Sequence, residues 1–181
     1  MKRPLILIFT TMVCLPTMAN AAGNRGSLYT NVGATLVSND SNQETAYFIQ
    51  AGYNYQMTKL LSADVSYKRV ETFNSSVSAN SDDFVQTYDA YGLGVRVDQQ
   101  VGLLGIYGKA GGSYISSETT VWDTVAGAKK TETDDSFKPY ASAGVSLMSP
   151  IGLVLDAGVT YQLLPNDEHA TSFNAGARFA F

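Results

Sequence analysis

The 181-residue sequence predicts an all-β fold, an eight-stranded antiparallel up-and-down barrel whose strands cross a membrane. Three observations lead to this prediction. Apolar and polar residues alternate along eight stretches, most of which reach about ten residues, the length that crosses a bilayer as a tilted strand. Short and long connections alternate between these stretches. Aromatic residues gather toward both ends of the apolar face, where a membrane meets water.

The N-terminal residues predict a cleaved secretory signal peptide. Lys2 and Arg3 precede a short apolar run from Pro4 to Pro16, and Ala19-Asn20-Ala21 has the small-x-small pattern of a cleavage site. We place the cleavage after Ala21, which assigns residues 1–21 to the signal peptide and 22–181 to the barrel domain. The alternative, a buried N-terminal helix, does not explain why charge, apolar run and cleavage pattern occur in this order.

Removal of this segment determines the chemistry of the mature chain. Cys14 is the only cysteine, so the exported chain is expected to contain no disulfide. Ten basic and sixteen acidic residues remain, a net charge of −6. An acidic exported chain is a poor candidate for binding nucleic acid, which requires a basic surface.

The eight expected strands span residues 27–37, 44–57, 61–70, 85–97, 103–115, 137–148, 153–163 and 170–181. The short connections are 58–60, 98–102 and 149–152, and the longer ones are 38–43, 71–84, 116–136 and 164–169. In a meander every second connection lies at the same end. This asymmetry is typical of outer-membrane barrels, which have short periplasmic turns and long external loops. An even number of strands also brings both termini to the short-turn end.

The two faces of these strands predict two different environments. The apolar face is small and aliphatic in its middle, with Tyr47, Tyr67, Tyr114 and Tyr161 toward the long loops and Tyr55, Phe179 and Phe181 toward the short turns. The other face is polar and rich in glycine. Glycine weakens an exposed strand without benefit, but inside a narrow barrel it makes room for large neighbours. We therefore expect the apolar face to meet lipid and the polar face to line the lumen.

The last strand carries the most specific resemblance. Asn174, Gly176, Phe179 and Phe181 follow the polar-x-Gly-x-x-aromatic-x-aromatic pattern that ends outer-membrane barrels. Over its whole mature length the chain resembles the small eight-stranded outer-membrane barrels, the group of the OmpA transmembrane domain and OmpX. The resemblance implies a location in the outer membrane, contact with lipopolysaccharide, and recognition of the last strand by the barrel assembly machinery. No further domain is expected, because the sequence ends with the barrel, and we expect a monomer.

Six charged residues have the parity of the inner face and form the expected interior network: Asp64, Lys68, Arg96, Lys109, Asp156 and Arg178. An isolated buried charge is costly, so these groups must pair. Adjacent strands favour the pairs Asp64–Arg96 and Asp156–Arg178. Both lysines lie higher, where hydroxyl groups or the same acids are their expected partners. The network predicts a lumen plugged by ion pairs. A narrow water-filled pore lined by the same groups is the rival interpretation.

Enzymatic activity is not expected. His169 is the only histidine, and although Thr171 lies where lipid A deacylase barrels carry His-x-Ser, no acidic residue follows to complete a triad. The acidic patches in the long connections (Asp82, Asp83, Asp134, Asp135, Asp167 and Glu168) lack ligand spacing, so neither a metal nor a cofactor is expected.

The long loops are therefore the expected functional part. Trp122, the only tryptophan, lies in the connection 116–136, where it could contact a partner or rest at the membrane surface. We expect a structural or surface-interaction protein, with a role in adhesion or envelope integrity. A small diffusion pore is the alternative, and a lipid A-modifying enzyme is a distant third.

Overall fold

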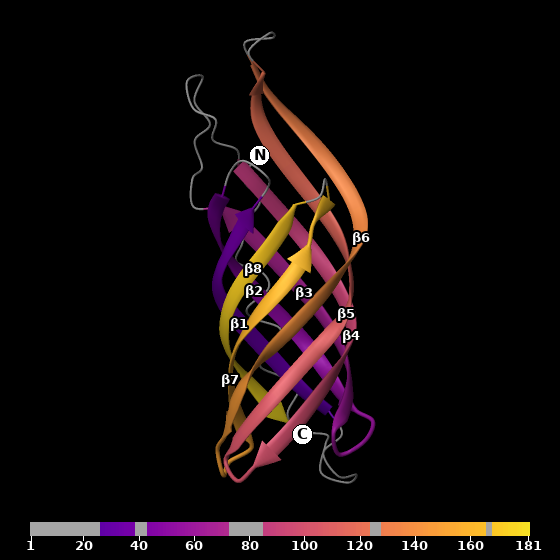
Figure 1. Ribbon diagram of the computed structural model, residues 1–181, viewed down its shortest axis with the longest axis vertical. Coiled ribbons are helices and arrows are strands. Elements are labelled where there is room, and N and C mark those ends of the chain that lie inside the picture. The colour runs from indigo at the N-terminus through magenta and orange to yellow at the C-terminus, as the bar shows by residue number, and fades with distance from the viewer. Residues whose placement is uncertain (1–25, 39–42, 73–84, 124–127, 166–167) are drawn as a thin grey trace.

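The computed structural model describes residues 26–38, 43–72, 85–123, 128–165 and 168–181. Its eight strands form one closed antiparallel barrel in which each strand pairs with the next and β8 pairs with β1 (Figure 1). The strands are β1 (Gly26–Ser38), β2 (Gln43–Gln56), β3 (Leu61–Thr72), β4 (Val85–Val101), β5 (Leu104–Asp123), β6 (Ala128–Met148), β7 (Leu153–Leu163) and β8 (His169–Ala180). The predicted fold class is confirmed. The expected signal peptide and its cleavage site lie outside the described residues.

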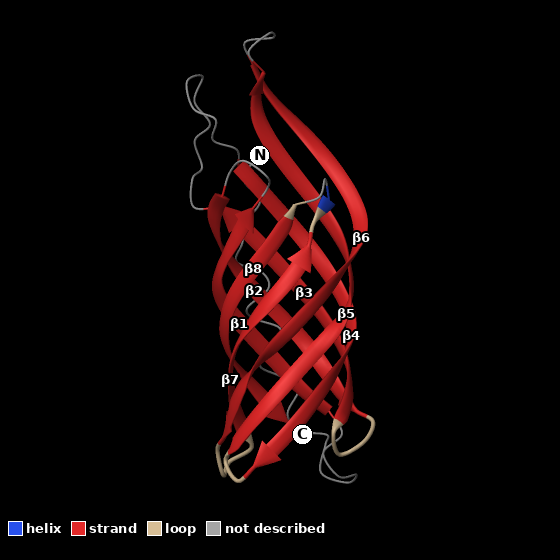
Figure 2. Ribbon diagram, in the orientation of Figure 1, coloured by secondary structure: helices blue, strands red, loops and turns tan. Residues whose placement is uncertain are grey.

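Nearly all of the described chain is strand (Figure 2). Within those residues, no helix has both the length and the apolar character needed to cross a membrane. The barrel closes between β1 and β8, from Ser27 opposite Ala180 to Ser38 opposite His169. Phe181 lies one residue beyond β8, yet its backbone N–H donates to the Gly26 carbonyl at 3.0 Å. The terminal aromatic residue is therefore held to the barrel wall.

The short turns lie at the end of the barrel that holds the C-terminus (Figure 1). Gly102 and Gly152 adopt positive φ angles of 64° and 82° in two of them, a conformation that glycine reaches without strain. The turn between β4 and β5 is shorter than expected, because β4 continues to Val101. Asp98, placed in this turn by the sequence pattern, is instead a strand residue opposite Tyr107.

The prediction of a loop over residues 116–136 was wrong. β5 and β6 continue to pair through this region, from Leu104 opposite Leu147 to Asp123 opposite Ala128, and rise above the other strands (Figure 1). The β4–β5 pairing ends at Thr120, so the tip of the hairpin has only its own pairs. Both faces of a hairpin beyond the membrane meet water. Its residues therefore lack the apolar alternation by which strands are recognised.

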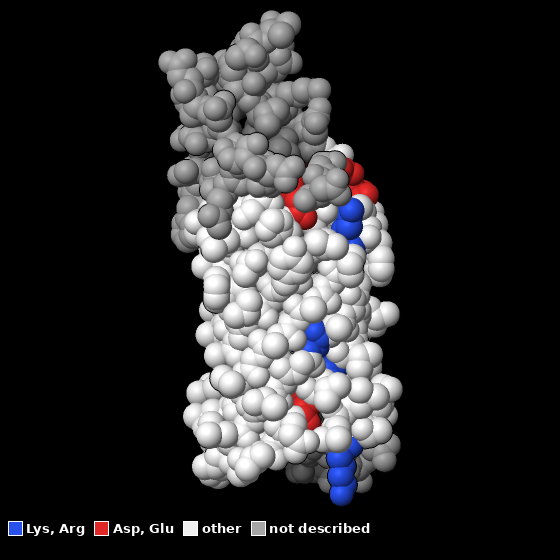
Figure 3. Space-filling view, in the orientation of Figure 1, with Lys and Arg blue, Asp and Glu red and all other residues white. Residues whose placement is uncertain are grey.

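The outer face is apolar, as predicted. Its central residues are exposed, with Val65 at 54% and Leu93 at 65%. Two of the predicted tyrosines, Tyr67 and Tyr114, take part in a continuous aromatic row across four strands. In this row Tyr67 lies opposite Tyr91, Tyr91 opposite Tyr114 and Tyr114 opposite Phe137. Figure 3 shows one side of the barrel, on which few charged side chains lie. Such a surface is suited to lipid, with an aromatic row toward the long-connection end.

The inner face is divided along the barrel. At the long-connection end a cluster of buried apolar side chains fills the interior: Val37, Ala46, Phe48, Val70, Tyr88, Ala90, Ile115, Leu164 and Ala170. Buried polar and charged side chains follow toward the short turns. An eight-stranded barrel is just wide enough for side chains to fill, so this layering decides whether anything can pass through the lumen.

Candidate functional site: the barrel lumen

A lower cluster of four charged side chains lies nearest the short turns and consists of Arg96, Asp98, Asp156 and Arg178. Arg96 Nη2 lies 2.9 Å from Asp98 Oδ1 and 3.2 Å from Asp156 Oδ1. Arg178 contacts the same two carboxylates, with Nη2 3.3 Å from Asp98 Oδ1 and Nε 3.4 Å from Asp156 Oδ2. Two guanidinium groups thus alternate with two carboxylates from β4, β7 and β8, and their charges balance.

Tyr107 supports this cluster from one side. The Arg96 guanidinium carbon lies 4.0 Å from the centre of the Tyr107 ring, a cation–π contact in a site shielded from water. The side chains of Arg96 and Asp156 are 6% and 4% exposed, whereas Arg178 and Asp98 are 15% and 25% exposed. The inner pair is therefore desolvated, and the outer pair is open toward the mouth of the barrel.

An upper cluster consists of Asp64, Lys68 and Lys109. Lys109 forms an ion pair with the Asp64 carboxylate and donates to the Tyr29 hydroxyl at 3.0 Å. Lys68 donates to Ser172 Oγ at 2.8 Å. Two ammonium groups thus lie in this part of the lumen, and that of Lys109 pairs with the carboxylate.

The structure places the six predicted residues in two separate groups, in which five form ion pairs and Lys68 bonds to a hydroxyl, and it changes one predicted pairing. Asp156 contacts Arg178, as expected. Asp64 pairs with Lys109 and not with Arg96, because Arg96 lies opposite Ser62 in the register and its guanidinium contacts Asp156 on β7. Gly94 is the residue opposite Asp64, and the Tyr140 hydroxyl occupies the space that a side chain at Gly94 would fill.

Sequence reasoning missed Asp98, the member that joins both arginines. A signal was available, since Asp98 is two residues from Arg96 and so has the parity of the inner face. It was instead assigned to the short connection 98–102. Tyr29 and Ser172 were also missed, because a phenol or a hydroxyl in an alternating strand gives no sign of which cation it will meet.

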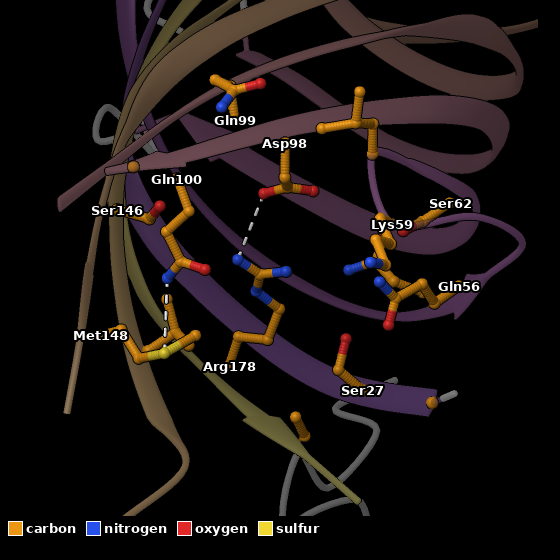
Figure 4. Close-up of a pocket in the computed structure, with 16 residues that line it drawn as sticks. Ser27, Gln56, Lys59, Ser62, Asp98, Gln99, Gln100, Ser146, Met148 and Arg178 are labelled. Atoms are coloured by element: carbon orange, nitrogen blue, oxygen red, sulfur yellow. Dashed lines mark hydrogen bonds and ion pairs between the residues drawn. The ribbon is translucent and has the colours of Figure 1, made fainter. Parts of the chain in front are cut away.

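A cavity of about 410 Å³ opens at the short-turn end, beneath the lower cluster (Figure 4). Arg178 and Asp98 form its inner wall, and Gln56, Lys59 and Gln100 stand around it. The mouth is therefore open up to the level of the ion pairs.

The remaining predicted residues are placed as follows. Trp122 lies in β5 opposite Lys129, and its side chain is outside the described part. The His169 ring stacks 5.6 Å from Tyr161. In the C-terminal pattern, Asn174 is 9% exposed in the lumen and Phe179 is 48% exposed outside, whereas Gly176 abuts Asn31.

The acidic patches do not form a metal site in the described part of the chain, where no group of three potential ligands could hold a metal ion. Asp134 and Asp135 belong to β6 and not to a loop. Glu168 is described just before β8, and Asp82, Asp83 and Asp167 lie outside the described residues.

A closed barrel of eight antiparallel strands, with an apolar outer face, an aromatic row and paired charges inside, defines an integral outer-membrane barrel. Comparison with known families agrees. Residues 5–181 match the family described as the outer membrane protein beta-barrel domain, and the chain belongs to this family. It is accordingly an outer-membrane protein. No curated protein matches the sequence significantly.

Solved structures share the fold at low identity. Neisserial surface protein A is similar with a TM-score of 0.71 and 15% identity, covering 87% of this chain and 98% of that one. Ail, the attachment invasion locus protein of Yersinia pestis, has a TM-score of 0.62 and 14% identity over 87% and 99% of the two chains. OprG from Pseudomonas aeruginosa has a TM-score of 0.55 and 12% identity over 87% and 97%.

Proposed function

We propose that this protein is a non-enzymatic surface-interaction protein that holds the β5–β6 hairpin outside the cell on a plugged barrel. The observation that carries the proposal is the length of this hairpin. β5 and β6 contain 20 and 21 residues, whereas β7 and β8 contain 11 and 12. Strands of about 9–11 residues suffice to cross the membrane, so the additional residues serve another purpose.

The charge and composition of the hairpin tip suit a binding element. Trp122, Lys129 and Lys130 lie in its paired strands. Tryptophan is among the residues that most often anchor an interface, and the two lysines add positive charge to the same tip. Lys130 also lies in the part of β6 that precedes its pairing with β7 at Tyr140. Lysine on such an open strand edge protects it from unwanted strand pairing. Ail, named for attachment and invasion, has the same fold and makes adhesion the first interaction to test.

The experiment shortens the hairpin without touching the barrel. Residues 121–130 are replaced by Asn-Gly, which favours a tight hairpin turn. Every pair between β4 and β5 remains, because that pairing ends at Thr120. Cells that display the intact protein should adhere to epithelial cells or matrix proteins, and cells with the shortened hairpin should lose this adhesion. The shortened barrel should retain the same heat-dependent shift in gel mobility.

A control keeps the length of the hairpin and changes only its chemistry. Trp122→Ser with Lys129→Ser and Lys130→Ser preserves the strands and removes the proposed anchors. Loss of adhesion in this variant supports side-chain recognition. Unchanged adhesion in both variants contradicts the hairpin as the binding element.

A small diffusion pore is the second candidate, favoured by the cavity of about 410 Å³ at the short-turn end. Against it stand the ion pairs above that cavity and the buried apolar cluster toward the opposite end. Single-channel recording in a planar bilayer separates the two. Folded protein that gives no openings supports the plugged barrel, and stable openings whose size follows salt concentration support the pore.

A proteolysis experiment tests the orientation on which the proposal rests. Protease added to intact cells should cut within or near the hairpin, while the short turns stay protected until the outer membrane is opened.

Recognition of Asn174, Gly176, Phe179 and Phe181 by the assembly machinery is part of the same proposal. It is supported by the position of Phe181 beside β1, the strand with which β8 closes the barrel.

A further inference from the structure

Lys68 is a buried cation without a carboxylate partner in the described part of the chain. The residue is 5% exposed, and its hydrogen bond goes to the neutral hydroxyl of Ser172. Its ammonium lies 4.6 Å from the centre of the Phe48 ring and 5.9 Å from that of Tyr88, both members of the buried apolar cluster. Aromatic faces and one hydroxyl stabilise a cation only in part, and a buried charge normally requires a counter-charge.

In the lower cluster, each buried cation is paired with carboxylates. Arg96 and Arg178 share Asp98 and Asp156, so two positive charges meet two negative ones. In the upper cluster, Asp64 is already engaged by Lys109. The side chain of Asp64 is 1% exposed and that of Lys109 is 8% exposed, so water screens this region weakly. A protonated Lys68 therefore has no counter-charge among the described residues.

A small cavity lies where this charge could be neutralised. Lys68 and Lys109 both line it, together with the polar side chains of Gln50, Ser66 and Ser142. Its volume is about 30 Å³, enough for one or two water-sized species, since a single water needs roughly 10–15 Å³. The carboxylate of Asp64 does not line this cavity.

We infer that this cavity binds one halide-sized anion, with Lys68 and Lys109 as its charged ligands. The charge excess selects an anion, and the volume selects a monatomic ion over a carboxylate metabolite. The anion completes the upper cluster as Asp98 completes the lower one. Chloride, abundant outside the cell, is the natural occupant. This site is independent of the hairpin and of its binding partner.

The test measures halide-dependent stability of the full barrel purified from outer membranes. Thermal unfolding is followed by gel mobility in chloride and gluconate mixtures at constant ionic strength. A ligand that binds only the folded state raises the midpoint and saturates as its site fills. We expect a saturable rise with chloride, and a single anomalous peak beside Lys68 in crystals grown with bromide.

Lys68→Met is the decisive variant, and Lys59→Met, at the exposed β2–β3 turn, is its matched control. The Lys68→Met barrel should lose the chloride dependence and be at least as stable as the wild type in gluconate. Lys59→Met should keep the wild-type response. Equal chloride dependence in all three proteins, or none in the wild type, overturns the site. If Lys68→Met does not fold, the bromide peak decides, and bromide found only at the mouth beside Arg178 refutes the inference.

Discussion

Asp156→Asn tests whether the lower cluster holds the barrel together. The carboxylate of Asp156 contacts both Arg96 at 3.2 Å and Arg178 at 3.4 Å, and its side chain is 4% exposed. The asparagine has nearly the same shape but no charge. It therefore leaves two guanidinium groups with Asp98 as their remaining carboxylate.

The magnitude follows from the burial of the pair. Removing one partner of a buried ion pair costs about 3–5 kcal/mol, because the other charge stays desolvated. We expect the lower value, about 3 kcal/mol, since Asp98 remains and is 25% exposed to the mouth. With a urea dependence of about 1–3 kcal/mol per molar, the unfolding midpoint should fall by roughly 1–3 M. Gel mobility of the refolded barrel across a urea series measures this change.

Asp89→Asn is the matched control. Asp89 also pairs with an arginine, Arg69 at 3.9 Å, but on the outer face and with 34% of its side chain exposed. Exposed pairs contribute about 0–1 kcal/mol, so this variant should unfold close to the wild type. Equal midpoints for Asp156→Asn and Asp89→Asn would refute the reasoning. Adding Arg178→Gln to Asp156→Asn should cost less than the two single changes together, because the groups are coupled.

Three further predictions concern packing, assembly and the plug. Gly144→Ala should cost about 1–3 kcal/mol, since the new methyl group collides with the Ala157 carbonyl oxygen and the Tyr107 ring. Gly108→Ala, whose methyl group meets open space, should stay within about 0.5 kcal/mol; urea midpoints compare the two. Phe181→Ser should reduce the amount of barrel recovered from outer membranes while refolding in micelles is unchanged. Arg178→Ala should lower the urea midpoint; unchanged stability together with unchanged conductance contradicts the plugged lumen.

The barrel could be predicted from sequence because the membrane imposes a two-residue alternation on every crossing strand. Val65 and Leu93 outside, and Asp64 and Arg96 inside, follow from parity alone. The partner of each inner charge could not be predicted. Whether Asp64 pairs with Arg96 or with Lys109 depends on the register and on which side chains can reach across the lumen. The alternation of apolar and polar residues contains information on neither of these.

The hairpin escaped prediction for the opposite reason. Beyond the membrane neither face of a strand meets lipid, so residues such as Thr133 and Asp134 read as loop although they lie in β6. Asp98 was likewise assigned to the turn that ends at Gly102, although it lies in β4 and its side chain faces the lumen. Alternation identifies strands only where two environments differ.

The same division of environments separates stability from function in this molecule. Buried ion pairs and the apolar cluster fill the lumen, so the barrel wall has little freedom to change without losing contacts on its inner face. After Thr120 in β5 and before Tyr140 in β6, the hairpin strands do not pair with β4 or β7. Substitutions there leave the contacts of the interior in place. A filled lumen therefore does not restrict the sequence of the hairpin tip, whereas a conducting lumen would have required the interior charges to remain open to water.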